Sequence, residues 1–385
     1  MNVIEDLVME ERRAAAQPSS DIFVVRGTNV SYDGFKALIE LMGKHELPFY
    51  KSEPLAGPKG PSGLIDRDDV VIVKVNSQWD ERGGTNTDLV RSIIETILAH
   101  PDGFTGEVLV ADNGQAQFGA LGSGGSLEYE RNNAEDTAQS VQAVVDTFSG
   151  ARVSTYLWDR ITTERVGEYA QGDVDDGYVV DDSPSPVTGI VVSYPKFRTR
   201  FGTYVSFKHG VWGPERGSYD GGRLKVINVP VLKAHRIYGV TACVKSYMGV
   251  ASDKLTGRAA HRSVGRGGMG TQMAETRMPA LNVLDAIWVN ANPGTGPGTT
   301  YQEATRLNTI AASVDPVAMD CWASKRVLMQ AARLKGHQEL SIFDPDNAEP
   351  GSFGGWLRLS MEEIVKTGYR ATADENRMNV YVSEL

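Results

Sequence analysis

Short apolar runs alternate along this chain with segments whose apolar residues recur at helical spacing. Runs of strand length lie at residues 21–26, 69–76, 107–111, 152–157, 223–229, 280–287, 308–313 and 379–383. Helical spacing is found at 31–44, 88–100 and 135–148, and we expect another helix after Asp315 and Pro316. Strands separated by helix-length crossovers are typical of a parallel sheet that is covered on both faces.

The pattern therefore predicts an α/β fold with a mostly parallel, open sheet and helices on both faces. Residues 160–220 interrupt the alternation with Asp-rich and Gly-rich stretches, and we interpret them as an inserted or second, smaller α/β subdomain. We divide the chain into a polar extension at 1–20, a main α/β domain at 21–275, and a C-terminal α/β portion at 276–385 that closes the cleft. A chain of 385 residues, 41% of them hydrophobic, is long enough to bury such a core.

Composition narrows the classes of function. A net charge of −10 argues against a nucleic-acid partner, because phosphate contacts need a basic surface. The two cysteines, Cys243 and Cys321, exclude an all-cysteine iron–sulfur cluster or a four-cysteine zinc site within one chain. No apolar run approaches the roughly 20 residues that span a bilayer, and the first segment is too polar for a signal peptide. We expect a cytoplasmic protein; a removed leader and a homo-oligomer stay open.

Polar residues follow the predicted strands at the sheet edge where open α/β folds bind ligands. Lys74 and Asn76 follow one strand, and a turn with Gly84 and Thr85 then opens a helix. Together with free helix N–H groups, these residues would form a cradle for a phosphate or a carboxylate. The turn matches neither GxGxxG nor GxxxxGK[ST], so an ordinary strand–helix loop is the alternative interpretation.

Residues 229–262 concentrate basic side chains in an acidic protein. This segment holds Lys233, His235, Lys245 and His261, and further lysine and arginine residues lie among them. Such a cluster attracts an anionic ligand and lowers the pKa of its lysines, which favours a neutral, nucleophilic amine. Lys245 follows the apolar run GVTACV, where a buried lysine is costly unless it has a function. The alternative interpretation is a solvated basic face.

Several of these stretches resemble the family known as domain of unknown function 362. They are VIVKVN, VINVPVLKAH, GVTACVKSYMG with a following His261, VLDAI and ASVDPVAMD, and they cover roughly residues 69–330. Some members of that family carry a ferredoxin-like cluster domain. This chain lacks the cysteines for one, so the resemblance implies no electron-transfer role here.

The order and spacing of His235, Lys245 and His261 also resemble those of nickel-dependent lactate racemase. The spacings are 10 residues (245 − 235) and 16 residues (261 − 245). The resemblance implies that Lys245 is joined covalently to a nickel-pincer nucleotide, that His261 ligates nickel, and that His235 is the general base. The residues it leaves to hold the cofactor phosphate or the substrate carboxylate are Lys74, Asn76, Gly84, Thr85 and Lys233.

One catalytic histidine of the racemases has no counterpart, because the corresponding loop reads VADNGQ and offers Asp112 as a substitute base. We therefore expect an enzyme that acts on a small anionic, hydroxy-acid-like substrate by proton or hydride transfer, related to racemases and epimerases or to oxidoreductases. Two alternatives stay open. One is a metal-free enzyme or a binding protein for a phosphorylated or carboxylated ligand, and the other is a non-catalytic assembly protein.

Overall fold

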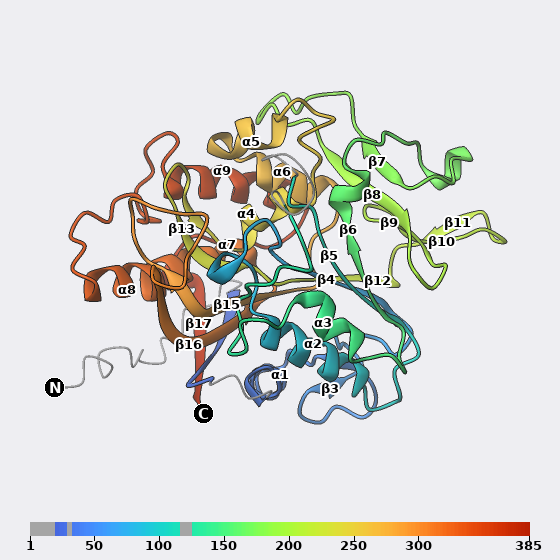
Figure 1. The fold of residues 1–385 in the computed structure, drawn as a ribbon, viewed down its shortest axis with the longest axis horizontal. Helices are drawn as coiled ribbons and strands as arrows, with labels where there is room; N and C mark the ends of the chain where they lie inside the picture. Colours follow the sequence, from blue (N-terminus) through green and yellow to red (C-terminus); the bar gives the residue numbers. More distant parts are fainter. Residues whose placement is uncertain (1–19, 29–32, 116–124) are drawn as a thin grey trace.

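A ten-stranded sheet forms the centre of the molecule in the computed structural model, which describes residues 20–28, 33–115 and 125–385 (Figure 1). Eight strands lie side by side in the order β17-β1-β16-β15-β12-β4-β5-β6, and β13 pairs with β15 and with β14. Their bounds are β1 (Ser20–Arg26), β4 (Val70–Lys74), β5 (Glu107–Asp112), β6 (Val153–Leu157), β12 (Leu224–Asn228), β13 (Val231–His235), β14 (Gly239–Thr241), β15 (Leu281–Asn290), β16 (Ala304–Ser313) and β17 (Met378–Glu384).

The sheet is mostly parallel, which confirms the predicted α/β class. Strands β15, β12, β4, β5 and β6 run parallel to one another, as do β1 and β17. Strand β16 runs antiparallel to both β15 and β1. The apolar run at 308–313 therefore ends at the edge opposite to the carboxyl ends of β4 and β5, and Asp315 lies there rather than in the cleft.

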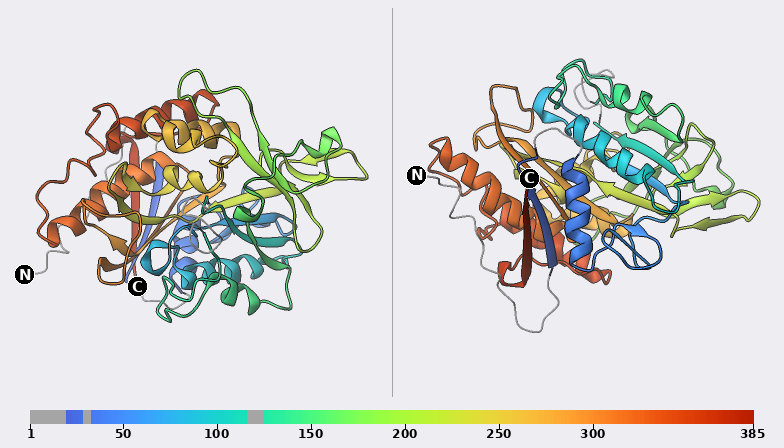
Figure 2. Two further views of the ribbon diagram at one scale, coloured as in Figure 1. Left: turned by 45° about the horizontal axis from the view of Figure 1, so that its top comes forward. Right: turned by 90° about the horizontal axis from the view of Figure 1, so that it is seen from below.

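Helices cover both faces, because alternate side chains of each central strand enter different cores (Figures 1 and 2). Val71 and Val73 of β4 pack with α1 (Asp33–Lys44), α2 (Thr87–Leu98) and α3 (Val141–Asp146). Val70 and Ile72 belong to the other core. The helices on that face are α4 (Cys243–Ser246), α5 (Ala259–Ser263), α6 (Gly268–Glu275), α7 (Pro316–Ala323), α8 (Met329–Leu334) and α9 (Phe353–Lys366).

The smaller subdomain is a five-stranded antiparallel sheet, without an α-helix between residues 177 and 220. Its strands are β7 (Gly177–Val180), β8 (Ser193–Arg198), β9 (Tyr204–Ser206), β10 (Gly210–Gly213) and β11 (Ser218–Asp220), and they lie beside the main sheet in Figure 1. A two-stranded sheet pairs β2 (Tyr50–Lys51) with β3 (Lys59–Gly60).

Strand pairing crosses the expected boundary at 275/276, because β15 pairs with β12 in the same sheet. The strands on either side of that boundary therefore share one sheet. Among the described residues, no helix is both long and apolar enough to span a bilayer.

Candidate functional site

A narrow cavity of about 40 Å³ lies beyond the carboxyl ends of β4 and β5. Five of the residues singled out in the sequence line it, namely Asn76, Asp112, Lys233, Lys245 and His261. The other lining residues are Gln78, Trp79, Asn113, Gln115, Thr241, Ser246, Met248, Gly249 and Pro297. Lys74, Gly84, Thr85 and His235 are not among the lining residues.

Lys245 enters this cavity from α4, a helix of only four residues. The helix has no side-chain cap of its own, and Asp320 of α7 replaces one: its carboxylate accepts hydrogen bonds from the backbone N–H groups of Cys243 (2.6 Å) and Val244 (3.0 Å). The Lys245 side chain is buried. Within the described part of the chain its amine has no hydrogen-bond or ion-pair partner, and its nearest recorded contact is the Tyr238 ring, 5.3 Å from Nζ. Burial lowers the pKa of Lys245 to about 8.

Lys233 and Thr241 form a cross-strand pair in the same cavity, since they are direct partners in the antiparallel β13–β14 register. The Lys233 amine donates to the carbonyl of Gly83. Burial, together with the nearby Lys245, lowers the pKa of Lys233 to about 7. The buried Oγ1 of Thr241 has no hydrogen-bond partner among the described residues. Sequence reasoning missed Thr241, although a hydroxyl inside the apolar run GVTACV is a signal for it.

His261, on α5, contributes an imidazole that is fixed by Asp253, a second residue that sequence reasoning missed. Nδ1 of His261 contacts the Asp253 carboxylate, and the same carboxylate accepts the His261 backbone N–H. A carboxylate on Nδ1 holds the ring proton there and leaves Nε2 unprotonated. The ring can therefore accept a proton or ligate a metal through Nε2.

The ring of His235 is oriented by hydrogen-bond donors rather than by a carboxylate. Its Nδ1 accepts hydrogen bonds from the backbone N–H groups of Ile237 and Tyr238, both at 3.2 Å. The neutral ring therefore carries its proton on Nε2. Burial, and then the charges of Lys245 and Lys233, lower the pKa of His235 to about 2. This geometry favours a hydrogen-bond donor over the general base that the racemase resemblance implies.

Lys74 and Asp112 neutralise each other below the cavity. Lys74 is fully buried, its amine lies 3.0 Å from Oδ1 of Asp112, and it donates to Val75 O and to both oxygens of Ser246. The second Asp112 oxygen accepts from the N–H and the hydroxyl of Ser77. A side chain at Gly249 would place Cβ 1.9 Å from Oδ1 of Asp112, so only glycine fits there. Lys74 is thus a structural ion-pair partner rather than an anion ligand, and Asp112, which lines the cavity, is held by Lys74 and Ser77.

The polar groups of the predicted anion cradle are also engaged in hydrogen bonds within the protein. Oγ1 of Thr85 accepts from Asn76 N and donates to Val229 O, both at 2.8 Å. The Asn76 side chain accepts from Val231 N and donates to Ser246, and Gly84 O accepts from Asn133. The N-terminus of α2 is capped by its own Asn86. This turn therefore fastens β4, α2 and β13 together, as the alternative interpretation of an ordinary loop expects.

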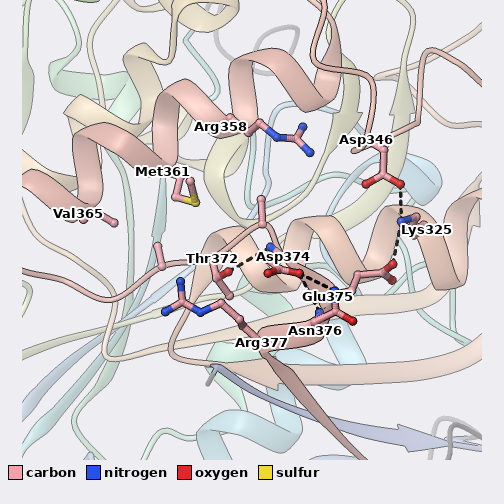
Figure 3. Close-up of a pocket in the computed structure, with 12 residues that line it drawn as sticks. Lys325, Asp346, Arg358, Met361, Val365, Thr372, Asp374, Glu375, Asn376 and Arg377 are labelled. Atoms are coloured by element: carbon pink, nitrogen blue, oxygen red, sulfur yellow. Dashed lines mark hydrogen bonds and ion pairs between the residues drawn. The ribbon is translucent and has the colours of Figure 1, made fainter. Parts of the chain in front are cut away.

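A second, larger cavity of about 700 Å³ lies between α9 and the segment before β17 (Figure 3). Lys325 pairs there with Asp346 (2.5 Å) and Glu375 (2.7 Å), and Arg358 donates to backbone carbonyls. None of the residues predicted for the site lines it. The smaller cavity is therefore the candidate site, because it is lined by Lys245, whose amine has no hydrogen-bond or ion-pair partner among the described residues, and by Thr241, whose buried hydroxyl has no hydrogen-bond partner among them.

Comparison with known proteins gives one match. Residues 225–325 match the family described as Domain of unknown function (DUF362), and this range includes Lys233, Thr241, Lys245, Asp253 and His261. No curated protein and no solved structure matches the chain, so these comparisons do not show the resemblance to lactate racemase. The match over residues 225–325 supports the resemblance of this chain to the family named domain of unknown function 362.

Proposed function

We propose that this chain is an enzyme that binds a small anionic, hydroxy-acid-like substrate and transfers a proton at the carbon next to its anionic group. One observation carries the proposal: Lys245, buried and without a hydrogen-bond or ion-pair partner among the described residues, shares a cavity with His261, whose Nδ1 contacts the Asp253 carboxylate so that Nε2 of the neutral ring can accept a proton. A buried amine of this kind is stabilised by an anion, and an oriented imidazole is a common general base.

The chemistry follows from these positions. The Lys245 ammonium binds the substrate carboxylate and stabilises the negative charge that develops when the neighbouring C–H bond breaks. His261 Nε2 accepts that proton, and Asp253 stabilises the imidazolium that forms. Return of the proton from Nε2 to the same face of the carbon regenerates the neutral imidazole and the original configuration, so this base alone exchanges the α-hydrogen with solvent. The reaction class is therefore proton transfer at carbon, the step that racemases and epimerases share.

A nickel-pincer nucleotide at this site would need Lys245 and His261 in one cavity and free groups to bind its phosphate. Lys245 and His261 do line one cavity, as the racemase resemblance requires. Lys74, Thr85 and the N-terminus of α2, which would bind the phosphate of the nucleotide, are engaged internally, however. The site therefore does not fit a nucleotide.

The proposal is tested by measuring exchange of the substrate α-proton with solvent. In D₂O we expect the wild type to exchange the α-proton of a small hydroxy acid, and NMR measures this exchange for a panel of acids that includes lactate and malate. His261→Ala removes the base, and Asp253→Asn shifts the ring proton to Nε2, so each is expected to slow exchange by about 10²-fold or more. Lys254→Met, a change of an exposed lysine, should leave the rate unchanged. Absence of exchange with every acid, or an undiminished rate in His261→Ala, would overturn the proposal.

A further inference from the structure

We propose that the substrate is a dianion, a small dicarboxylate or phosphate monoester, which Lys245 binds at one anionic group and the Lys233–Thr241 pair binds at the other. This inference rests on the proposed function and names the class of substrate that the same cavity takes. Three features support this inference. Two lysines at the cavity lack a contacting carboxylate, the Thr241 hydroxyl lacks a hydrogen-bond partner among the described residues, and the two lysines are held by separate elements.

Two lysines at the cavity, Lys233 and Lys245, have no carboxylate within ion-pair distance among the described residues. Lys74 pairs with Asp112, and Asp253 acts on Lys245 from beyond that distance while its carboxylate contacts His261. Burying two ammonium groups without a contacting carboxylate is costly, and a ligand with two negative groups supplies a contact for each.

Two acidic side chains act on Lys233, Asp112 and then Asp285 of β15, and neither makes an ion pair with it; Asp112 pairs with Lys74 instead. The Asp285 carboxylate accepts hydrogen bonds from the backbone N–H groups of Asn86 and Ile287 and from the Asn133 side chain. The amine of Lys233 has one recorded acceptor, Gly83 O, out of three N–H groups. It therefore keeps donors for an anionic oxygen.

Thr241 adds a second donor beside Lys233. Directly paired residues of an antiparallel ladder place their side chains on the same face, about 5 Å apart at Cβ. Oγ1 of Thr241 is buried in the cavity lining and has no hydrogen-bond partner in the part of the chain that the structure describes, which is unfavourable unless a ligand satisfies it. Lys245 enters from α4, a different element, so the cavity presents two separate points of anion recognition.

The test is a comparison of affinities by titration calorimetry at fixed pH 7 and ionic strength. The dianions malonate and malate are compared with the monoanions acetate and lactate. We expect the wild type to bind the dianions at least tenfold more tightly. Lys233→Met should abolish this preference and keep weak monoanion binding, whereas Lys245→Met should weaken both classes. Thr241→Val, which keeps the shape, should reduce only dianion affinity, by about fivefold.

The outcomes separate this inference from the proposed function. Equal affinity for mono- and dianions in the wild type overturns the dianion inference and leaves the anion-binding enzyme standing. Absence of binding for all four acids overturns both. A preference that survives in Lys233→Met and Thr241→Val overturns the assignment of those residues. Lys254→Met, which removes an exposed positive charge of the same segment, controls for the loss of a charge alone.

Discussion

The two histidines of the basic segment show how hydrogen bonds decide the role of a residue. Backbone donors on Nδ1 turn His235 into a donor at Nε2, while the Asp253 carboxylate on Nδ1 turns His261 into an acceptor at Nε2. The spacing of the histidines in the sequence cannot distinguish these states, because both depend on neighbours that the local pattern does not specify. The assignment of the base moves from one histidine to the other for this reason.

The buried lysines make stability depend on pH. The pKa of Lys233 is lowered from 10.5 to about 7 in the folded state, so between pH 7 and about 10 the unfolded chain binds more protons at this residue than the folded one. Stability from this residue therefore rises with pH through that window and is lost as the pH falls through 7. The slope is at most about 1.4 kcal/mol per pH unit.

Urea unfolding at pH 6, 7, 8 and 9 measures this effect. We expect the wild type to gain stability above pH 7 relative to Lys233→Met, whose side chain does not titrate. Lys254→Met, an exposed position, should follow the wild-type curve. Parallel curves for the wild type and Lys233→Met would show that Lys233 is not a buried charge.

At the scale of elements, the strand and helix patterns were largely correct, and the errors fall near the site. Strands β1, β4, β5, β6, β12 and β17 lie where the apolar runs predict them. The segment VLKAH was not predicted as a strand, because it alternates polar and apolar residues over only five positions, yet it forms β13 and carries Lys233. Helix α4 has four residues, too few to show any helical spacing, and it carries Lys245.

The position of Lys245 depends on Asp320 because α4 is too short to hold itself. We expect Asp320→Ala to leave two buried N–H groups without acceptors, to lower the free energy of unfolding by about 1–3 kcal/mol, and to weaken anion binding more than tenfold. Asp315→Ala is the matched control. It removes the cap of α7 at the opposite sheet edge and should destabilise the protein without changing anion affinity. Affinity is measured by calorimetry below both melting temperatures, and equal affinities for the two variants would contradict the positioning role.

At the scale of the whole molecule, packing sets the space that remains beyond the carboxyl ends of β4 and β5, where the candidate site lies. The cavity is narrow because Trp79, Met248 and Pro297 close around the polar groups from three separate segments of the chain. Because Lys74, Thr85 and the N-terminus of α2 are engaged internally and cannot bind the phosphate of the pincer nucleotide, we expect the purified protein to have the unmodified mass at Lys245 and no stoichiometric nickel, even from a host that makes that nucleotide. Intact-mass spectrometry and metal analysis test this directly, and an adduct on Lys245 would restore the cofactor hypothesis.

The sequence by itself determined the alternation of strands and helices, the two covered faces of the sheet, and the gathering of polar residues at the strand ends. Its apolar periodicity is local and is imposed by the burial of neighbouring positions. Only the tertiary structure decided which polar groups are used internally and which stay open. Lys74 pairs with Asp112 and donates to Ser246, the latter 172 residues away. Among the described residues, Lys245 has no hydrogen-bond or ion-pair partner, and the Thr241 hydroxyl has no hydrogen-bond partner. Such pairings depend on distances between remote segments, which no local pattern contains.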